Sequence, residues 1–503
     1  MPLACIAIRI VLVCGTGAAS VLLLPPFSML PLTPVVWSVL LICLTGTSAR
    51  MAAVLGFFFG SFQFCFGLSW IAESFYVDAA RFGALGVPSV AALSVFLAVF
   101  PALAATVFAL LSRYIHPGLP TAVILACTWT GAEWLRGHLL TGFPWNLAGY
   151  ALTDFDGLRQ PAAWVGSYGM SFLVVLIGAL PGATWVSTGR HRRTTIAAAL
   201  LMPLVLWSSG NLRLLRKEPE PTGVFLRVVQ GNFPQTEKWD TGADQRALSR
   251  YASLSSAGRE VDIVLWPETA FPGYLDENAD ARARISASLP RDSLLMTGAL
   301  ARRKVGDLTY YYNALQVYDD RGSILNSYAK HHLVPFGEYT PLPDWVPLDR
   351  IVDSVGDFSP GPGPRTLVLP KIPPVAPAIC YEIIFPGHVV EGQLRSSWIF
   401  NPTNDAWFGI SIGPRQHLAS AQMRAVEEGL PVVRAANTGV SAVIDANGRI
   451  LQQLDIGVTG TIDSELPPAL PKTLYARFGD WMFVILAALF AAPALMTRID
   501  LRS

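Results

Sequence analysis

Three residues in the polar part of the chain have side chains that could together perform nucleophilic catalysis: Glu268, Lys330 and Cys380. A cysteine thiol, with an unperturbed pKa of about 8.5, is mostly protonated at neutral pH. A nearby carboxylate can take its proton as the sulfur attacks, and an ammonium group can stabilise the oxyanion of a tetrahedral intermediate. Each residue taken singly has an ordinary explanation as packing or solvated charge. The residue types therefore suggest a chemistry without establishing a site.

The elements that must position these residues are predicted to be strands, each of which ends just before one of the three candidates. A β-branched run over 261–266 stops just before Glu268, and Lys330 follows the second of two runs, 313–318 and 323–329, that flank a hairpin turn. Functional residues of α/β enzymes often stand at strand ends, and we place Cys380 at such an end as well. Further elements are expected as strands at 224–230, 398–400, 440–444 and 449–451 and as a helix at 417–428. Residues 222–470 are thus predicted to form a layered α/β sandwich.

The rest of the chain is apolar enough to indicate a membrane protein. Of the 503 residues, 52% are hydrophobic and only 15% are charged, whereas a soluble domain carries about 25% charge. Residues 1–212 contain seven apolar runs, each near the roughly 20 residues that cross a bilayer, and residues 481–497 form an eighth. The seven runs are 4–24, 29–47, 52–72, 85–112, 119–136, 162–187 and 194–211.

Arginine asymmetry gives the expected orientation of the eight transmembrane helices. With the N-terminus inside, the inner short segments hold eight arginines and the outer ones three. The inner set is Arg9, Arg50, Arg113, Arg190, Arg192, Arg193, Arg498 and Arg502, and the outer set is Arg81, Arg136 and Arg159. We therefore expect cytoplasmic N- and C-termini and place the 222–470 domain on the periplasmic side.

Several other classes of function are disfavoured by composition. The formal net charge of +1 and the lack of a long basic run give no support to nucleic-acid binding. Cys380 has no cysteine partner in the polar domain, and no metal-ligand pattern is present, so no metal is expected. His331 and His332 are adjacent, and adjacent residues of a strand point to opposite faces, which argues against joint ligation.

Three motifs, in order along the chain, resemble the Glu-Lys-Cys triad segments of the nitrilase (carbon-nitrogen hydrolase) superfamily. They are Leu265-Trp266-Pro267-Glu268, the segment from Lys330 to Tyr339, and Ile379-Cys380-Tyr381-Glu382. The whole chain is similar to the membrane-embedded family of that superfamily, the apolipoprotein N-acyltransferases. Further matching segments are 142–145, 149–150, 230–232, 238–240, 404–409 and 434–439.

The resemblance implies roles for individual residues and an αββα sandwich for the polar domain. It makes Cys380 the nucleophile, Glu268 the general base and Lys330 the oxyanion stabiliser. It also implies a supporting set and a set that shapes the active site and its lipid entrance, namely Glu338, Tyr381 and Glu382, and Trp239, Trp407 and Glu427. One position departs from the family's Glu-x-Gly-Arg-Pro pattern, because Leu430 stands where arginine is usual.

The implied reaction is a ping-pong acyl transfer without a cofactor. A phospholipid would donate an acyl chain to Cys380, and the α-amine of the diacylglyceryl-cysteine of an apolipoprotein would accept it. The expected setting is the inner membrane of a Gram-negative cell, among membrane lipids and without nucleic acid, with the enzyme a monomer.

Two rival hypotheses fit parts of the sequence. A membrane-tethered amidase would use the same triad, but a single span would suffice to tether it. A transporter or polyisoprenoid-handling membrane protein with an accessory outer domain would place function in the spans, which hold few ionisable residues away from their ends. The proline- and glycine-rich segment 341–363 is expected to be either an ordinary loop or a lid at the lipid surface.

Overall fold

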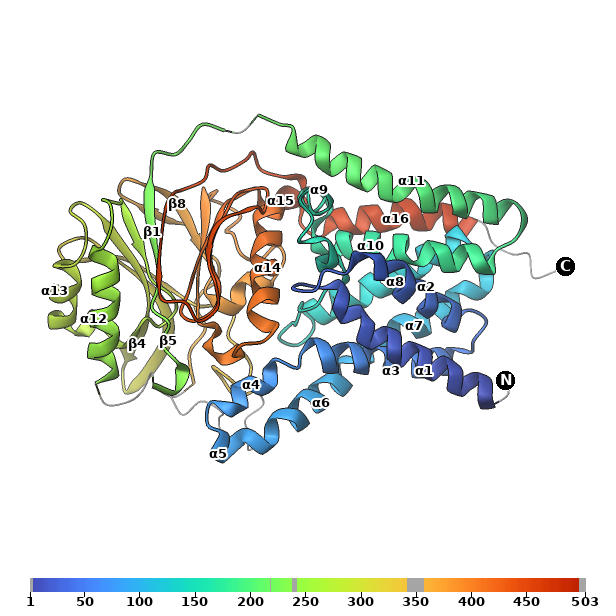
Figure 1. Ribbon diagram of the computed structural model, residues 1–503, viewed down its shortest axis with the longest axis horizontal. Helices are drawn as coiled ribbons and strands as arrows, with labels where there is room; N and C mark the ends of the chain where they lie inside the picture. The colour runs from blue at the N-terminus through green and yellow to red at the C-terminus, as the bar shows by residue number, and fades with distance from the viewer. Residues whose placement is uncertain (1–2, 218, 238–241, 342–356, 497–503) are drawn as a thin grey trace. The chain divides into compact units, whose positions relative to one another are not determined.

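The computed structural model describes residues 3–217, 219–237, 242–341 and 357–496. Within it the chain separates into two compact units. One is helical and contains α1 to α3, α6 to α11, α15 and α16 (Figure 1). The other contains both sheets and spans Lys217–Pro471, together with the short segment Glu73–Ala84. That segment carries α4 and α5 and comes from between two apolar helices of the first unit.

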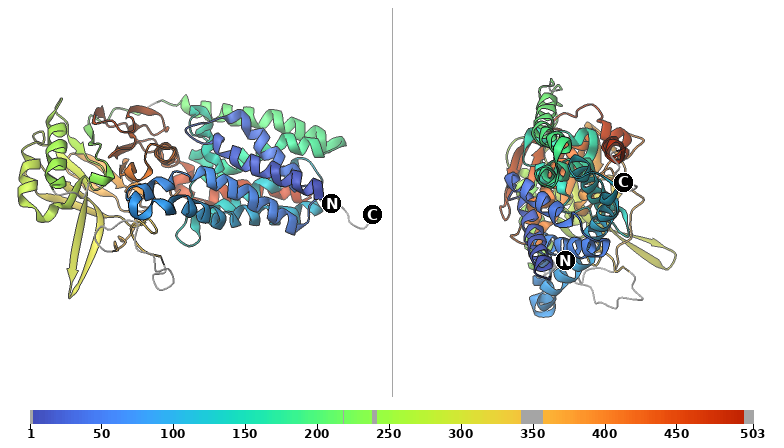
Figure 2. Two further views of the ribbon diagram at one scale, coloured as in Figure 1. Left: turned by 60° about the horizontal axis from the view of Figure 1, so that its bottom comes forward. Right: turned by 90° about the vertical axis from the view of Figure 1, so that its right-hand side faces the viewer.

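The helices of the first unit run alongside one another as a bundle (Figure 2). The pairs of helices in contact include α1 with α3, α3 with α7, α2 with α10, and α8 with α10. The helix bounds are α1 Leu3–Ser20, α2 Thr33–Leu44, α3 Ala49–Gly67, α4 Ile71–Tyr76, α5 Ala79–Phe82, α6 Gly86–Leu97, α7 Val99–Leu111, α8 Leu119–His138, α9 Asp156–Arg159, α10 Ala162–Val186, α11 Gly189–Leu214, α15 Leu474–Phe478 and α16 Trp481–Met496.

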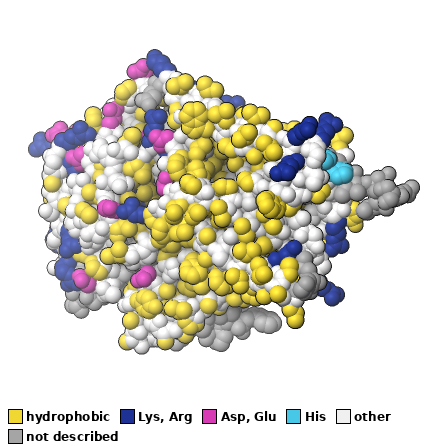
Figure 3. All heavy atoms as spheres, turned by 45° about the vertical axis from the view of Figure 1, so that its right-hand side comes forward, with side chains coloured by type: hydrophobic (Ala, Val, Ile, Leu, Met, Phe, Trp, Pro, Cys, Tyr) yellow, Lys and Arg dark blue, Asp and Glu magenta, His cyan; other side chains and the backbone are white. Residues whose placement is uncertain are grey.

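The surface of the helical unit is unusually apolar. Hydrophobic side chains cover a wide area of the face drawn in Figure 3, and α11 alone exposes Leu200, Val205 and Trp207 by more than half. Such a surface would be unstable in water and suits a lipid environment. Among the described residues, five helical segments are long and apolar enough to cross a membrane. Helices α2 and α16 are shorter, so the count of eight spans stays a prediction, while the membrane-protein class is confirmed.

A non-helical loop after α8 lies inside the helical unit, with its backbone polar groups bonded to side chains of α8. Arg136 Nη1 donates to the carbonyl oxygens of Phe143 and Trp145 at 2.5 and 2.7 Å. Glu133 Oε1 accepts from the Ala148 N–H at 3.0 Å. Irregular backbone is tolerated in such a unit only where its polar groups find partners. The buried charges of α8 therefore serve the adjacent loop.

The second unit contains two mixed sheets. The first has the order β13-β1-β2-β4-β5-β6 with β3 beside β4, and the second has the order β12-β11-β10-β9-β8-β7. Strands β1, β2 and β4 are mutually parallel, as are β8, β9 and β10. The strand bounds are β1 Phe225–Gln230, β2 Ile263–Leu265, β3 Phe271–Tyr274, β4 Leu294–Val305, β5 Leu308–Tyr318, β6 Ile324–Ala329, β7 Leu367–Leu369, β8 Ile372–Pro377, β9 Trp398–Thr403, β10 Val432–Ala436, β11 Ser441–Ile444, β12 Ile450–Leu454 and β13 Gly460–Glu465.

The two sheets pack face to face and are covered by helices on their outer faces (Figure 1). One buried cluster joins the sheets and includes Leu265, Val317, Val375 and Phe400. A second joins the first sheet to α12 (Ala243–Ser256) and α13 (Ala279–Ser286), while α14 (Gly413–Glu428) packs on β10 of the second sheet. The predicted αββα order is confirmed.

Most strands predicted from the sequence are present. The 313–318 and 323–329 runs pair as antiparallel β5 and β6, and the Asn447-Gly448 turn joins β11 to β12. Strand β4, whose far half projects with β5 as a hairpin (Figure 2), was not predicted from the sequence. Strand β10 and helix α12 were missed as well. The strand end expected before Cys380 is that of β8, for which the sequence had given no bounds.

Candidate active site

Lys330 lies between two carboxylates at the end of β6. Its Nζ is 2.9 Å from Glu338 Oε1 and 3.4 Å from Glu268 Oε1, and its side chain is only 1% exposed. Burial alone would lower the pKa of Lys330, but the charges of Glu338 and Glu268 more than offset it and raise that pKa above the usual value. The ammonium form is therefore held in place at neutral pH.

Asn313 of β5 completes this cluster and was not identified from the sequence. Its Nδ2 donates to Glu268 Oε1 at 2.6 Å and to Glu338 Oε1 at 2.8 Å. Glu338 also accepts from the Val334 N–H at 2.7 Å through Oε2. The two carboxylates are thus oriented by neutral donors as well as by Lys330. The signal in the sequence that could have indicated Asn313 was the presence of an asparagine within a buried stretch of strand.

Two backbone features bring Glu268 into this cluster. Thr269, the next residue, has a φ of +46°, a conformation that a β-branched residue rarely adopts. Gly298 of β4 lies so close that a Cβ there would be 2.5 Å from Glu268 Cα. The turn after β2 therefore depends on a glycine opposite it.

Cys380 begins a short 3₁₀ turn, η8 (Cys380–Ile384), and two residues separate it from the end of β8. It has a φ of +49° although it is not glycine. Such backbone strain costs of the order of 1–3 kcal/mol and persists only where the surroundings impose it. Strained backbone of this kind is common at functional sites.

Glu268 and Lys330 lie close enough to Cys380 for their charges to act on its thiol. Burial raises the pKa of Cys380, the Glu268 carboxylate raises it further, and the Lys330 ammonium lowers it. The net shift is upward, so the resting sulfur is a thiol. An uncharged thiol becomes a useful nucleophile only if a base removes its proton during attack.

Glu382 ties the turn of Cys380 to the segment of Lys330. Its carboxylate accepts from the Ile379 N–H and the His331 N–H, each at 2.7 Å, from the His332 N–H at 3.2 Å, and from the Tyr328 hydroxyl. His331 Nδ1 lies 2.6 Å from the same side chain. Burial alone would raise the pKa of Glu382, but its bonds to His331 lower it below the usual value. The predicted supporting residue is therefore a buried anion that joins two site segments.

A second buried hydrogen-bond network contacts the backbone of Cys380, and no role was predicted for its residues from the sequence. His417 Nε2 is 3.1 Å from the Cys380 carbonyl oxygen, and its Nδ1 is 2.9 Å from Asp405 Oδ1. Arg434 Nη2 donates to Asp405 Oδ2 at 2.6 Å. Burial alone would raise the pKa of Asp405, but Arg434 and His417 lower it to about 2. Burial and Arg434 lower the pKa of His417.

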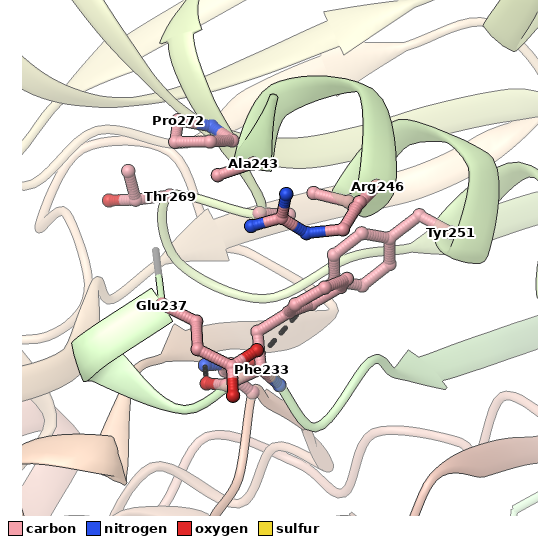
Figure 4. A pocket seen from close by; sticks show the side chains of 10 residues that line it. Phe233, Glu237, Ala243, Arg246, Tyr251, Thr269 and Pro272 are labelled. Atoms are coloured by element: carbon pink, nitrogen blue, oxygen red, sulfur yellow. Dashed lines mark hydrogen bonds between the residues drawn. The ribbon is translucent and has the colours of Figure 1, made fainter. Parts of the chain in front are cut away.

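A pocket adjoins the residue that follows Glu268 (Figure 4). Its labelled side chains come from α12, from the segments after β1 and β2, and from β3; they are Phe233, Glu237, Ala243, Arg246, Tyr251, Thr269 and Pro272. Asn437 closes it, accepting from the Phe233 N–H at 3.0 Å. The pocket offers both aromatic and charged walls beside the general-base candidate.

The remaining predicted residues lie in different surroundings. Tyr381 packs with its ring against Phe385 and His332. The Trp407 carbonyl accepts from the Ser74 hydroxyl at 2.9 Å. Trp239 lies outside the described residues, as does most of the expected loop or lid at 341–363.

Glu427, predicted to shape the active site and its entrance, is fully buried on α14. Its Oε2 is 2.7 Å from Arg424 Nε, and Arg424 donates to the Ile384 carbonyl at 3.4 Å. The pair therefore supports the last residue of the 3₁₀ turn that Cys380 begins. Leu430, at the position where arginine is usual, is buried just after α14.

Comparison with known proteins identifies the family. The model of the apolipoprotein N-acyltransferase N-terminal domain matches residues 16–180, and the carbon-nitrogen hydrolase model matches residues 226–473. A relative named apolipoprotein N-acyltransferase from Rhodopseudomonas palustris is 40% identical, covering 97% of this chain and 95% of its own. One of the same name from Bradyrhizobium diazoefficiens is also 40% identical, covering 97% and 94%.

Among solved structures, Nit3 of Saccharomyces cerevisiae, described as a nitrilase-superfamily member, is 18% identical with a TM-score of 0.36. It covers 49% of this chain and 90% of its own. The relatives, in contrast, are similar over nearly their full length, through the helical and the sheet unit alike. The chain therefore belongs to the apolipoprotein N-acyltransferase family.

Proposed function

We propose that this chain transfers an acyl chain from a membrane phospholipid to the N-terminal α-amine of a diacylglyceryl apolipoprotein, through a thioester on Cys380. The observation that carries the proposal is the buried cluster of Glu268, Lys330 and Glu338, in which the charges of Glu268 and Lys330 act on the Cys380 thiol. The full-length relatives named apolipoprotein N-acyltransferase supply the substrate class.

In the first step the Cys380 sulfur attacks the carbonyl carbon of a phospholipid ester while Glu268 takes the thiol proton. Lys330 stabilises the negative oxygen of the resulting tetrahedral intermediate. The intermediate collapses by breaking the carbon–oxygen ester bond. Glu268 returns the proton to the departing oxygen, which leaves as the hydroxyl of a lysophospholipid. The product on the enzyme is a thioester, and Glu268 is again a carboxylate.

In the second step the neutral α-amine of the diacylglyceryl-cysteine attacks the thioester carbonyl. Glu268 accepts a proton from the nitrogen, and Lys330 again stabilises the oxyanion. The carbon–sulfur bond breaks, and the sulfur takes the proton from Glu268 to restore the thiol. Glu338 holds the Lys330 ammonium and, with Asn313, keeps the base oriented throughout.

A membrane setting suits these substrates, because lifting an acyl chain into water costs about 0.8 kcal/mol per CH₂ group. The apolar surface of the helical unit supports such a setting. We place the enzyme in the inner membrane with the sheet unit on the periplasmic side, in keeping with the arginine asymmetry.

The test is mass spectrometry of the purified full-length protein after incubation with phospholipid alone. The expected result is one fatty-acyl mass on Cys380, lost on addition of a diacylglyceryl lipopeptide and recovered on that peptide's N-terminus. Cys380→Ala should carry no adduct, whereas Cys65→Ala, a matched change at an exposed cysteine of α3, should behave as wild type. Absence of the adduct on wild type would refute the proposal.

A further inference from the structure

The backbone around Cys380 is fixed by a side-chain circuit that starts from a single guanidinium. Arg434 of β10 bonds to Asn401 of β9 through Nη1 and to Asp405 through Nη2. Asn401 Nδ2 donates to the Ala378 carbonyl at 2.6 Å, and Asp405 pairs with His417. The polar side chains of this circuit are all buried, namely those of Arg434, Asn401, Asp405 and His417.

His417 is the member of this circuit that reaches the candidate nucleophile. A carbonyl oxygen only accepts, so the 3.1 Å contact between Nε2 and the Cys380 carbonyl requires a proton on Nε2. The other ring nitrogen lies 2.9 Å from Asp405 Oδ1 and 3.0 Å from Arg434 Nη2. Nδ1 therefore faces Asp405 and Arg434, and Nε2 bonds to the carbonyl of Cys380 itself.

That bond acts on the conformation that matters for the thiol. Cys380 has a positive φ that its side chain disfavours, so the peptide planes on either side must be held by neighbours. The Ile379 carbonyl accepts from the Glu382 N–H at 3.1 Å on one side, and the Cys380 carbonyl contacts His417 on the other. Without the bond from His417, the Cys380 carbonyl loses a partner outside its own 3₁₀ turn, so the backbone of Cys380 can relax toward ordinary φ and ψ values, which turns the thiol away from Glu268 and Lys330.

We propose that His417, held by Asp405 and Arg434, is a positioning residue that sets the direction of the Cys380 thiol through the Cys380 carbonyl. The inference rests on the proposed function for its acyl-transfer readout. A buried polar network is a poor way to fill space, since apolar residues of similar volume are often at least as stabilising. A geometric role accounts for the pairing of both ring nitrogens.

Two substitutions separate this role from packing. Glutamine at 417 can place an amide N–H near the position of Nε2, whereas asparagine can reach only the position of Nδ1. His417→Gln therefore keeps a donor for the Cys380 carbonyl, and His417→Asn keeps only a polar group at the Nδ1 position, beside Asp405 and Arg434. A merely structural role predicts that the asparagine variant performs at least as well as the glutamine variant.

The experiment measures the rate of thioester formation on Cys380 in the full-length protein, at several phospholipid concentrations. We expect His417→Asn to be about 10²-fold slower than wild type at saturation, with an unchanged half-saturating concentration. His417→Gln should stay within about tenfold of wild type. Thermal unfolding of both variants shows that they are folded. Equal rates in the two variants, or a faster asparagine variant, would overturn the positioning role.

A second readout does not need acyl transfer: alkylation of Cys380 by iodoacetamide, followed on the peptide that contains it. The expected order of rates is wild type, His417→Gln, then His417→Asn. If wild type forms no thioester but this order holds, the proposed function fails and the positioning role stands. If all three proteins form the thioester equally fast, the proposed function stands and the positioning role is refuted.

Discussion

Glu382→Gln replaces one carboxylate oxygen by an NH₂ group in a side chain surrounded by donors. The Ile379, His331 and His332 N–H groups and the Tyr328 hydroxyl all point to the two oxygens. Whichever way the glutamine amide is turned, its NH₂ group faces at least one buried N–H. An unsatisfied buried donor costs about 1–3 kcal/mol, and the weakened pairing with His331 adds to this cost.

We therefore expect Glu382→Gln to destabilise the sheet unit by about 2–4 kcal/mol, equivalent to roughly 5–15 °C in midpoint temperature for a unit of this size. The assay is thermal unfolding of the full-length protein in detergent, followed by tryptophan fluorescence, because Trp266 and Trp398 are buried in this unit. Glu465→Gln is the matched control, since Glu465 makes one bond at the surface, to the Gly223 N–H. A shift below about 2 °C for Glu382→Gln would refute the reasoning.

The pH dependence of this effect has a definite sign. The pKa of Glu382 is lower in the folded protein than in the unfolded chain, where the pKa of a glutamate is about 4.3. Its contribution to stability is fully present above that value and is lost as the pH falls through the folded-state pKa. The difference between wild type and Glu382→Gln should therefore be constant from pH 6 to 8 and shrink below about pH 4. A difference that grows on acidification would contradict the assignment.

Four further outcomes are expected. Lys330→Met should slow thioester formation by about 10²–10³-fold, measured by single-turnover mass spectrometry, and an unchanged rate would exclude an oxyanion role. In wild type, the pKa of Lys330 is raised in the folded protein above the unfolded value of about 10.4. Its contribution to stability is therefore fully present below that value and is lost only as the pH rises through the higher folded-state pKa. Unfolding temperatures should accordingly show no loss from this group up to pH 10. Gly298→Ala should displace the Glu268 backbone and slow the same step by about 10²-fold, whereas alanine at exposed Gly392 should have no such effect. Arg434→Met leaves Asp405 buried without its cation and should cost about 3–5 kcal/mol in thermal unfolding, and a stabilised variant would show that the circuit is dispensable for folding.

The fold was largely predictable because its signals are local. Alternation and turn residues identify β5 and β6, and the Asn447-Gly448 turn identifies the β11–β12 hairpin. The bounds of β8, the strand expected before Cys380, could not be predicted because three of its six residues are proline, which is unusual inside a sheet. Helix α12 was missed because its sequence is mostly polar, with its few buried positions spread along one face.

The candidate site was predictable only as residue types at strand ends. The sequence places Glu268, Lys330 and Cys380 there, and their catalytic roles stay a prediction. The partners that orient them come from segments far away along the chain, such as Asn313 on β5 and His417 on α14. Nothing in local spacing indicates that a buried histidine bonds to a particular carbonyl, because that contact exists only after both sheets and α14 have packed.

The loop that follows α8 has a consequence for how the chain is made. Its buried backbone groups are bonded by Arg136 and Glu133 across only 7 to 15 positions. Contacts so close in sequence form early, before distant segments are available. The bonds from Arg136 and Glu133 can therefore form once residue 148 has left the ribosome, before α10 has emerged to add its own contacts, such as the bond from the Gly149 N–H to Ser171 Oγ. The loop would then enter the membrane with these polar backbone groups already hydrogen-bonded, and the later helices would pack against it.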